Sequence, residues 1–243
     1  MNERLKPIGI IFAAGLGTRL RPLTEKIPKP LAEVHGKTLL ERNMEGLLPH
    51  VGSFRIIINW LGEQIEAKIG NSFKGKPVTF IYQKNPKGGT LDALRRGVLF
   101  SSGNDIENYV VSNSDDIFAQ GFYDIFGMAI TRDSQKAYLV GKIINDKEKL
   151  KKLGVFLVDA GNNFQKIVEK PQEFVSNLAN VGIYYLPNQV REFLSAQENL
   201  SQTEHLITDL FNAYSEKYPI EVLPVDADYT PISSLEDLKK ANN

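Results

Sequence analysis

The chain has 243 residues, 42% of them hydrophobic and 24% charged, a composition typical of a globular protein with one large or two small domains. Its 29 basic and 29 acidic side chains cancel, so no overall field attracts it to nucleic acid or to an anionic membrane. No apolar run approaches the ~18 residues of a membrane span. We therefore expect neither nucleic acid nor a membrane as partner. The absence of cysteine excludes disulfides and suits the cytoplasm, and three scattered histidines argue against a zinc site.

The first half of the chain alternates strand and helix patterns. Near-continuous apolar runs such as Ile8–Phe12 are typical of strands buried on both faces, and so of a parallel sheet. The alternation predicts an α/β fold of the Rossmann-like, doubly wound type, in which ligands bind at the carboxyl ends of the strands. The expected strands are Ile8–Ala13, Phe54–Asn59, Val78–Gln83 and Tyr109–Ser112, and the expected helices are Thr38–Leu48, Leu61–Ile69 and Thr90–Phe100.

The second half of the chain is richer in strand patterns. A turn signal over residues 159–163 predicts a hairpin between Gly154–Val158 and Phe164–Val168. Because no linker separates the halves, we expect one domain over residues 1–243, with parts of about 1–135 and about 136–243. The other expected elements are strands Ala137–Ile144, Asn180–Leu186 and Ile220–Val225, and helices Asn188–Leu194, Thr203–Tyr218 and Ser233–Ala241.

A glycine-rich loop follows the first strand and carries the strongest functional signal. Gly15 and Gly17 lack a Cβ, so oxygens can approach the backbone N–H groups, and Arg19 and Lys29 can neutralise anionic charge. This pattern suits a bound triphosphate. It is not the dinucleotide fingerprint, whose third glycine would replace Leu20, and no Gly-Lys-Ser/Thr sequence closes a Walker loop.

The whole of residues 10–31 resembles the signature of the nucleoside-diphosphate-sugar pyrophosphorylases, or sugar-1-phosphate nucleotidylyltransferases. That signature reads Ala-Ala/Gly-Gly-x-Gly-Thr-Arg-Leu-x-Pro-Leu-Thr, then Pro-Lys-Pro/x-Leu. The resemblance implies that a nucleoside triphosphate and a sugar 1-phosphate give an NDP-sugar and pyrophosphate, with Mg²⁺ as cofactor. It also implies a supply of precursors for cell-surface polysaccharide, and family members often form homo-oligomers. The nucleotide-binding residues that it implies here are Ala13, Ala14, Gly15, Gly17 and Thr18, with Arg19 and Lys29 as catalytic cations.

The segment Tyr82–Leu94 joins an expected strand to an expected helix. Gln83 offers a donor and an acceptor, and two glycines allow a flat ring to approach the backbone. An ordinary connection would look similar. The resemblance implies that Gln83 and one of Gly88 and Gly89 contact the nucleobase, and the extra glycine leaves both candidates open.

Asp115 follows a buried strand, where a carboxylate is costly unless it binds a ligand or caps a helix. The oxygens of the Asp115 carboxylate are hard ligands of the kind that Mg²⁺ prefers. The resemblance makes Asp115 a catalytic metal ligand, although Ser114 replaces the family's usual glycine. In the family a second aspartate lies near the C-terminus, and alignment places Pro231 there. Asp228 is the expected substitute ligand and Asp226 the alternative; with neither, Asp115 would hold the metal with phosphates and water, or activity would be weakened.

The dipeptide Glu169-Lys170 would by itself be an ordinary solvated pair. The resemblance implies that Glu169 accepts hydrogen bonds from sugar hydroxyls and that Lys170 binds the sugar's phosphate. Gly154 and Asn180 would line the same pocket, which makes the strand-rich second part the sugar-binding part and the first part the nucleotide-binding part.

Three other functions share some of these residues. A cytidylyltransferase acting on phosphocholine or another non-sugar phosphate would share the loop, but it needs an aromatic or acidic box for a quaternary ammonium. A glycosyltransferase could bind a metal through Asp115 and Asp116, yet it needs no Arg19–Lys29 clamp. A catalytically weak, nucleotide-sugar-binding regulatory subunit is favoured by Pro231.

Overall fold

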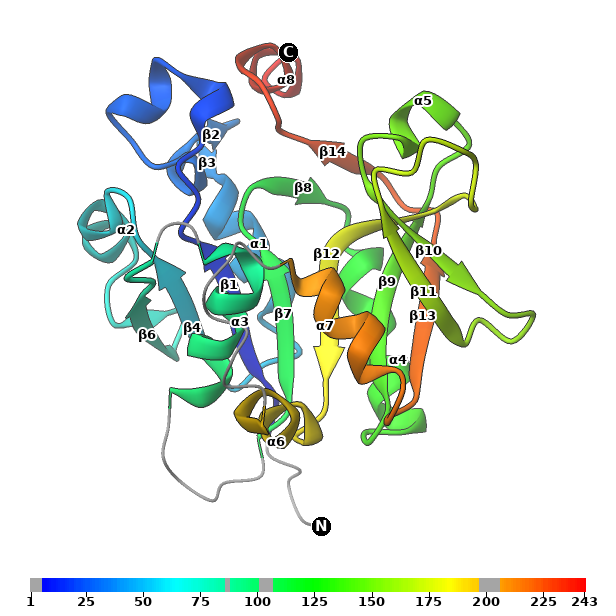
Figure 1. Cartoon of the computed structure of the whole chain (residues 1–243). Helices are drawn as coiled ribbons and strands as arrows, with labels where there is room; N and C mark the ends of the chain where they lie inside the picture. Colours follow the sequence, from blue (N-terminus) through cyan, green and yellow to red (C-terminus); the bar gives the residue numbers. More distant parts are fainter. Residues whose placement is uncertain (1–5, 86–87, 101–106, 197–205) are drawn as a thin grey trace.

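The computed structural model describes residues 6–85, 88–100, 107–196 and 206–243, and is organised around one ten-stranded sheet (Figure 1). Its main path runs β11-β10-β12-β7-β1-β4-β6-β5, and β9 joins β12 to β13. The centre, β7-β1-β4-β6, is parallel, and β12 pairs antiparallel with β7, β9 and β10. The strands are β1 (Ile8–Ala13), β4 (Ser53–Ile58), β5 (Ser72–Phe73), β6 (Lys76–Tyr82), β7 (Tyr109–Asn113), β9 (Ala137–Ile143), β10 (Gly154–Val158), β11 (Phe164–Glu169), β12 (Leu178–Leu186) and β13 (Ile220–Val225).

Helices cover both faces of the sheet, which makes the three-layer arrangement that a doubly wound fold requires. One apolar cluster joins the sheet to α1 (Leu39–Leu47), α2 (Gly62–Ile69) and α4 (Gly121–Arg132). The other joins the opposite face to α3 (Gly89–Leu99), α6 (Gln189–Ala196) and α7 (Ile207–Tyr214). The smaller elements are β2 (Glu33–Val34), β3 (Lys37–Thr38), β8 (Asp116–Phe118), α5 (Lys147–Leu150), β14 (Tyr229–Pro231), α8 (Leu235–Ala241) and the 3₁₀ turns η1 (Thr18–Leu20), η2 (Leu23–Glu25) and η3 (Lys29–Leu31).

The predicted α/β fold is confirmed, and each predicted strand is present within a few residues of its expected bounds. The predicted hairpin joins β10 to β11, and Asp159 stabilises its turn by accepting from the N–H groups of Gly161 and Asn163 at 2.8 and 2.9 Å. The helix expected over Thr203–Tyr218 is shorter, because α7 covers Ile207–Tyr214, and residues 203–205 lie outside the described residues.

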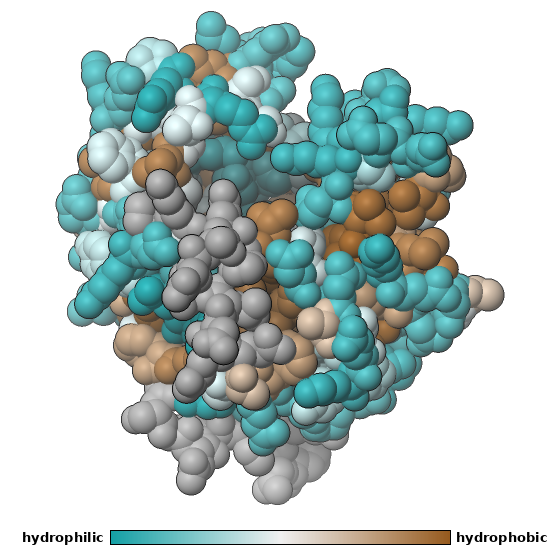
Figure 2. All heavy atoms as spheres, in the orientation of Figure 1, coloured by the Kyte–Doolittle hydropathy of each residue, from teal (hydrophilic) through white to brown (hydrophobic). Residues whose placement is uncertain are grey.

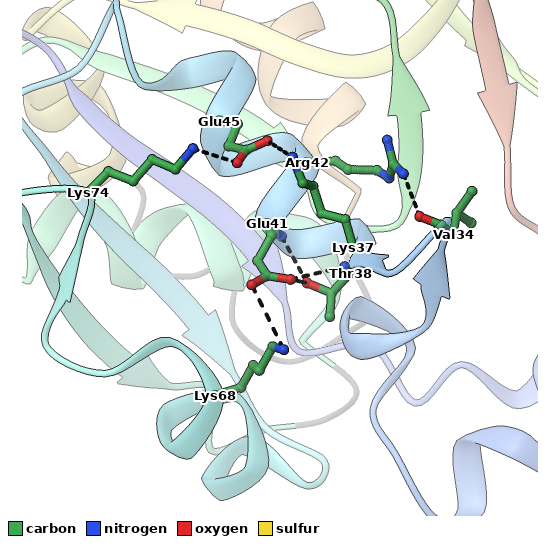
Figure 3. A network of polar contacts seen from close by, with 8 residues as sticks. All are labelled: Val34, Lys37, Thr38, Glu41, Arg42, Glu45, Lys68 and Lys74. Carbon is green, nitrogen blue, oxygen red and sulfur yellow. Dashed lines mark hydrogen bonds and ion pairs between the residues drawn. The ribbon is translucent and has the colours of Figure 1, made fainter.

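Helix α1, which packs beside the strand ends, is fixed at its start by a capping box (Figure 3). The Thr38 hydroxyl accepts from the Glu41 N–H at 3.1 Å, and the Glu41 carboxylate accepts from the Thr38 N–H at 3.0 Å. One turn later, Glu45 bridges Lys37 and Lys74, and hydrogen bonds from these two lysines lower the pKa of Glu45. These contacts tie α1 to β3 and to the β5–β6 turn.

Candidate active site

A cavity of about 470 Å³ lies at the carboxyl edge of the parallel strands. The register places Phe12 of β1 opposite Asn113 of β7, so the segments that follow these strands emerge side by side. Figure 2 shows the surface hollowed between the part that carries β2 and β3 and the part that carries α5. The residues lining the cavity are Phe12, Ala14, Gly15, Leu16, Gly17, Thr18, Arg19, Leu20, Lys29, Pro30, Gln83, Gly89, Thr90, Ala93, Asn113, Ser114, Asp115, Leu206 and Ser233.

The glycine-rich loop makes a sharp bend at Gly17, whose φ of 61° is the left-handed conformation that suits glycine. A Cβ on Gly17 would lie 2.9 Å from Cγ2 of Thr24 and 3.1 Å from Cβ of Lys29. The Thr24 hydroxyl donates to the Gly17 carbonyl at 2.8 Å and holds the bend closed. Trp60 anchors the same loop, because its indole N–H donates to the Thr24 carbonyl at 3.0 Å.

The backbone of this loop presents free donors to the cavity. Within the part of the chain that the structure describes, no hydrogen bond uses the N–H groups of Gly15, Leu16 and Gly17. A Cβ built on Gly15 would meet no atom within 4 Å, so that side of the backbone is open. Consecutive unpaired amides around a glycine bend form the kind of concave site that binds phosphate oxygens.

Lys29 and Asp115 meet at the cavity wall. Lys29 Nζ lies 2.6 Å from Asp115 Oδ2, and the two side chains are 10% and 38% exposed. Lys29 is therefore almost buried, and its ammonium is directed at the carboxyl edge of the sheet. Arg19 is exposed and lines the same cavity, so both cations predicted from the sequence lie at the cavity.

Ser114 and Asp116, the neighbours of Asp115, are held by the protein. The Ser114 hydroxyl donates to the Phe12 carbonyl at 2.6 Å, which explains how serine is accommodated where a glycine is expected. Asp116 accepts from the Tyr229 hydroxyl at 2.8 Å and from the Ile232 N–H at 3.0 Å. Burial raises the pKa of Asp116 to about 6, and the nearby Asp115 carboxylate adds to the shift.

The second predicted metal ligand, Asp228, is not brought to Asp115. In the β8–β14 pairing, Pro231 lies opposite Asp116, whereas the Asp228 carbonyl accepts from Ala119 at the far end of β8. Asp228 is exposed and does not line the cavity. The alternative, Asp226, forms an ion pair with Lys142 at 2.8 Å. Among the described residues, no group of three or more His, Cys, Asp or Glu side chains could hold a metal ion.

The predicted base pocket forms the end of the cavity near β6. Gln83 is 5% exposed, and its side-chain amide donates to the Gly89 carbonyl at 2.9 Å. Asn59, at the end of β4, donates to the Gln83 carbonyl and fixes its backbone. Gly89 has a φ of 65° and lines the cavity, while Gly88 does not. Of the two glycines that the sequence left open, Gly89 is therefore the one at the cavity.

The predicted sugar residues lie together on β10–β12 but do not line this cavity. Gly154 pairs with Glu169, and a Cβ on Gly154 would lie 2.9 Å from Glu169 Oε1. Asn180 accepts from the Tyr184 hydroxyl at 2.9 Å, and the Glu169 carboxylate contributes to raising the pKa of Tyr184, which burial raises most. Lys170 is exposed and has a φ of 45°.

Several lining residues were not predicted. Thr90 accepts from the Ile207 N–H at 2.9 Å and so joins the starts of α3 and α7 at the cavity. Ser233 reaches it from the C-terminal segment. Each is the first residue of an expected helix, and nothing in the sequence indicates that segments more than a hundred residues apart would meet here. None of the described helices has the length and apolar character needed to span a membrane.

Comparisons with known proteins indicate the family of the chain. The family described as nucleotidyl transferase matches residues 8–230. The bifunctional protein GlmU of Methanococcus aeolicus is 29% identical over 233 residues, which are 96% of this chain and 53% of that protein. Mannose-1-phosphate guanylyltransferase catalytic subunit beta of Drosophila melanogaster is 35% identical over 181 residues, 72% of this chain and 47% of that protein. The chain thus spans about half the length of these curated relatives.

A solved UDP-glucose pyrophosphorylase in complex with UDP-glucose has the same fold, with a TM-score of 0.84, 21% identity and 98% of both chains covered. The match of the family over most of this sequence, with its signature loop at the cavity, shows that the chain belongs to the nucleotidyl transferase family.

Proposed function

We propose that the chain catalyses the reaction of a nucleoside triphosphate with a sugar 1-phosphate to give an NDP-sugar and pyrophosphate. The observation that carries the proposal is the row of unpaired N–H groups at Gly15–Gly17, which faces a cavity walled by Arg19 and Lys29. Such donors, beside two cations, suit a triphosphate whose last two phosphates leave as pyrophosphate.

In the proposed reaction, an oxygen of the sugar phosphate forms a bond to the α-phosphorus. The bond from that phosphorus to the bridging oxygen breaks in line, and pyrophosphate leaves with its electron pair. A phosphate monoester is already anionic near neutral pH, so this nucleophile needs no general base. Catalysis therefore consists of positioning the reactants and neutralising charge.

The chain's residues divide these roles. The loop amides and Arg19 hold the β- and γ-phosphates, with Ala13, Ala14 and Thr18 shaping the loop. The nearly buried ammonium of Lys29 stabilises the charge that develops at the α-phosphate. Gln83 and Gly89 contact the base. Gly154, Glu169, Lys170 and Asn180 bind the sugar phosphate on the strand-rich part.

Asp115 is the residue that we propose to hold Mg²⁺. Its partly exposed carboxylate at the cavity wall fits the ion, which commonly takes one or two carboxylates together with phosphate oxygens. Bound there, magnesium would neutralise phosphate charge.

A pyrophosphate-release screen of several NTPs against a panel of sugar 1-phosphates, with and without Mg²⁺, tests the proposal. The panel must vary both partners, because the relatives are named for different bases and sugars: guanylyl transfer to mannose 1-phosphate and uridylyl transfer to glucose 1-phosphate. Release that requires a sugar 1-phosphate supports the proposal. Release of pyrophosphate only with phosphocholine would favour the non-sugar alternative. Nucleotide binding without release of pyrophosphate would favour the regulatory subunit. Pro231, at the place of the family's second aspartate, also favours the regulatory subunit.

The variant Asp115→Asn should lose the Mg²⁺ stimulation of turnover, because an amide oxygen is a poorer ligand than a carboxylate for a hard cation. The measurement is the rate of pyrophosphate release over a magnesium titration. A titration curve that matches the unmodified protein would remove Asp115 from the site.

A further inference from the structure

A hydrogen-bonded clasp holds the C-terminal segment against the strand end that carries Asp115. The clasp consists of Asp116, Tyr229 and the backbone of Ile232. The Tyr229 hydroxyl donates to Asp116 Oδ2 at 2.8 Å, and the Ile232 N–H donates to Oδ1 at 3.0 Å. The Tyr229 ring stacks on Phe118, with centroids 5.2 Å apart and planes 20° from parallel. One carboxylate therefore joins residues that lie more than a hundred positions apart in the chain.

Residue 116 is fixed on its backbone side as well. The Asp116 carbonyl accepts from the Asn43 side-chain amide at 3.0 Å, and the oxygen of the same side chain accepts from Ser112 and Tyr123 at 3.2 and 3.0 Å. Because both its carboxylate oxygens and its carbonyl have donors, Asp116 can hardly rotate. Its carboxylate oxygens are both used by the clasp, whereas the carboxylate of the neighbouring Asp115 is paired with Lys29.

The segment held by the clasp includes Pro231, the position at which the family resemblance implies a second metal-binding aspartate. Pro231 lies directly opposite Asp116 in the β8–β14 pairing, and its side chain has no ligand atom. Asp228 is at the other end of that pairing, and Asp226 is paired with Lys142. The orientation of the Asp115 carboxylate then decides how well the cavity can hold a cation together with phosphates.

We propose that the Tyr229–Asp116 clasp is the positioning device for Asp115, and that it fixes the carboxylate in the direction needed to bind a divalent cation with the pyrophosphate group. This inference rests on the proposed function. Tyr229 and Asp116 are positioning residues, because they act through Asp115. Groups that orient a metal ligand commonly affect metal affinity by about 10–100-fold when they are removed.

The test uses Mn²⁺ with pyrophosphate, which requires neither a known base nor turnover. Manganese held by the slowly tumbling protein relaxes water protons more strongly than the free manganese–pyrophosphate complex does. A titration of proton relaxation therefore gives the affinity directly. Tyr229→Phe removes only the hydroxyl and keeps the ring on Phe118. We expect it to weaken the affinity about tenfold.

The matched control is Tyr214→Phe. The Tyr214 hydroxyl is also buried, and it has no hydrogen-bond partner among the described residues, so this variant should bind manganese pyrophosphate as the unmodified protein does. Thermal unfolding of both variants separates stability from affinity. A lower melting temperature for Tyr229→Phe with unchanged affinity would overturn the inference, since the hydroxyl would then be merely structural.

A double-mutant cycle shows whether Tyr229 acts through Asp115. In the Asp115→Asn background, Tyr229→Phe should have no further effect on the residual affinity, and an undiminished tenfold loss there would contradict the proposal. Asp116→Asn, which keeps one acceptor oxygen, serves as the second clasp variant under the same cycle. If the unmodified protein does not retain manganese pyrophosphate at all, the proposed function fails and this inference with it. Retention without any effect of Tyr229→Phe overturns the inference alone.

Discussion

Two glycines of the glycine-rich loop have different surroundings, although they lie only two positions apart in the sequence. Gly17 is packed against Thr24 and Lys29 in a left-handed conformation, while Gly15 faces open space within the cavity wall. A methyl group at Gly17 would therefore disturb the protein itself. A methyl group at Gly15 would disturb only what the cavity binds.

Gly17→Ala should lower the free energy of unfolding by about 1–2 kcal/mol or more, from the left-handed backbone and the contact with Thr24. Gly15→Ala should leave stability nearly unchanged and weaken the binding of pyrophosphate. Thermal unfolding and equilibrium binding, measured on both variants, check the pair. Equal losses of stability would contradict the different surroundings described for the two positions.

Lys29→Ala should reduce turnover about 10²–10³-fold, which is the usual effect of losing one transition-state donor. Lys26→Ala is the matched control, because Lys26 is exposed in the same loop and does not line the cavity. The measurement is the rate of pyrophosphate release at saturating substrates. Turnover near that of the unmodified protein would exclude the role proposed for Lys29.

At the scale of elements, α4 closes one face of the sheet and buries His50 beside it. His50 Nε2 lies 3.7 Å from Asp124 Oδ1 on α4, and the imidazole also packs near Gly127. Burial lowers the pKa of His50 below its ordinary 6.5, although the Asp124 carboxylate opposes the shift. The folded protein therefore favours the neutral imidazole, and protonating His50 costs folding free energy.

The stability of the protein should consequently depend on pH through His50. Because its pKa is lower in the folded than in the unfolded state, the unfolded chain binds the proton more readily. Stability is fully present above pH 6.5 and falls as the pH drops through the folded pKa. His50→Gln should flatten this part of the curve of unfolding free energy against pH, while His35→Asn, at an exposed position, should leave it unchanged. Parallel curves for all three proteins would refute the assignment.

At the scale of the whole molecule, the sequence predicted the elements that follow a strong period and missed those that depend on distant partners. The local sequence pattern was enough to predict the buried strands β1 and β4 and the turn of the β10–β11 hairpin. Helix α4 was missed although Phe122, Phe126 and Ala129 have helical spacing, because Gly121 and Gly127 weaken the pattern. The strands β8 and β14 have three residues each and exist only because they pair.

In the candidate site, too, the residues with a local sequence signal were predicted and those that depend on distant partners were missed. The loop, Lys29 and Asp115 were placed by the rule that ligands lie at the carboxyl ends of parallel strands. Pro231 argues against a strand, yet β14 tolerates it as a short edge strand. The clasp of Asp116 and Tyr229 could not be predicted, because a hydrogen bond across 113 positions leaves no local trace. The single domain with parts of about 1–135 and about 136–243 stays a prediction.

Strand β12 pairs with β9 along one edge and with β10 and β7 along the other, so strands from the first and the second half of the chain share one backbone ladder. A hinge between them would have to break hydrogen bonds along this shared strand. The two proposed substrate sites therefore lie on one continuous sheet, and a movement that closes one half of the chain on the other has to twist that sheet.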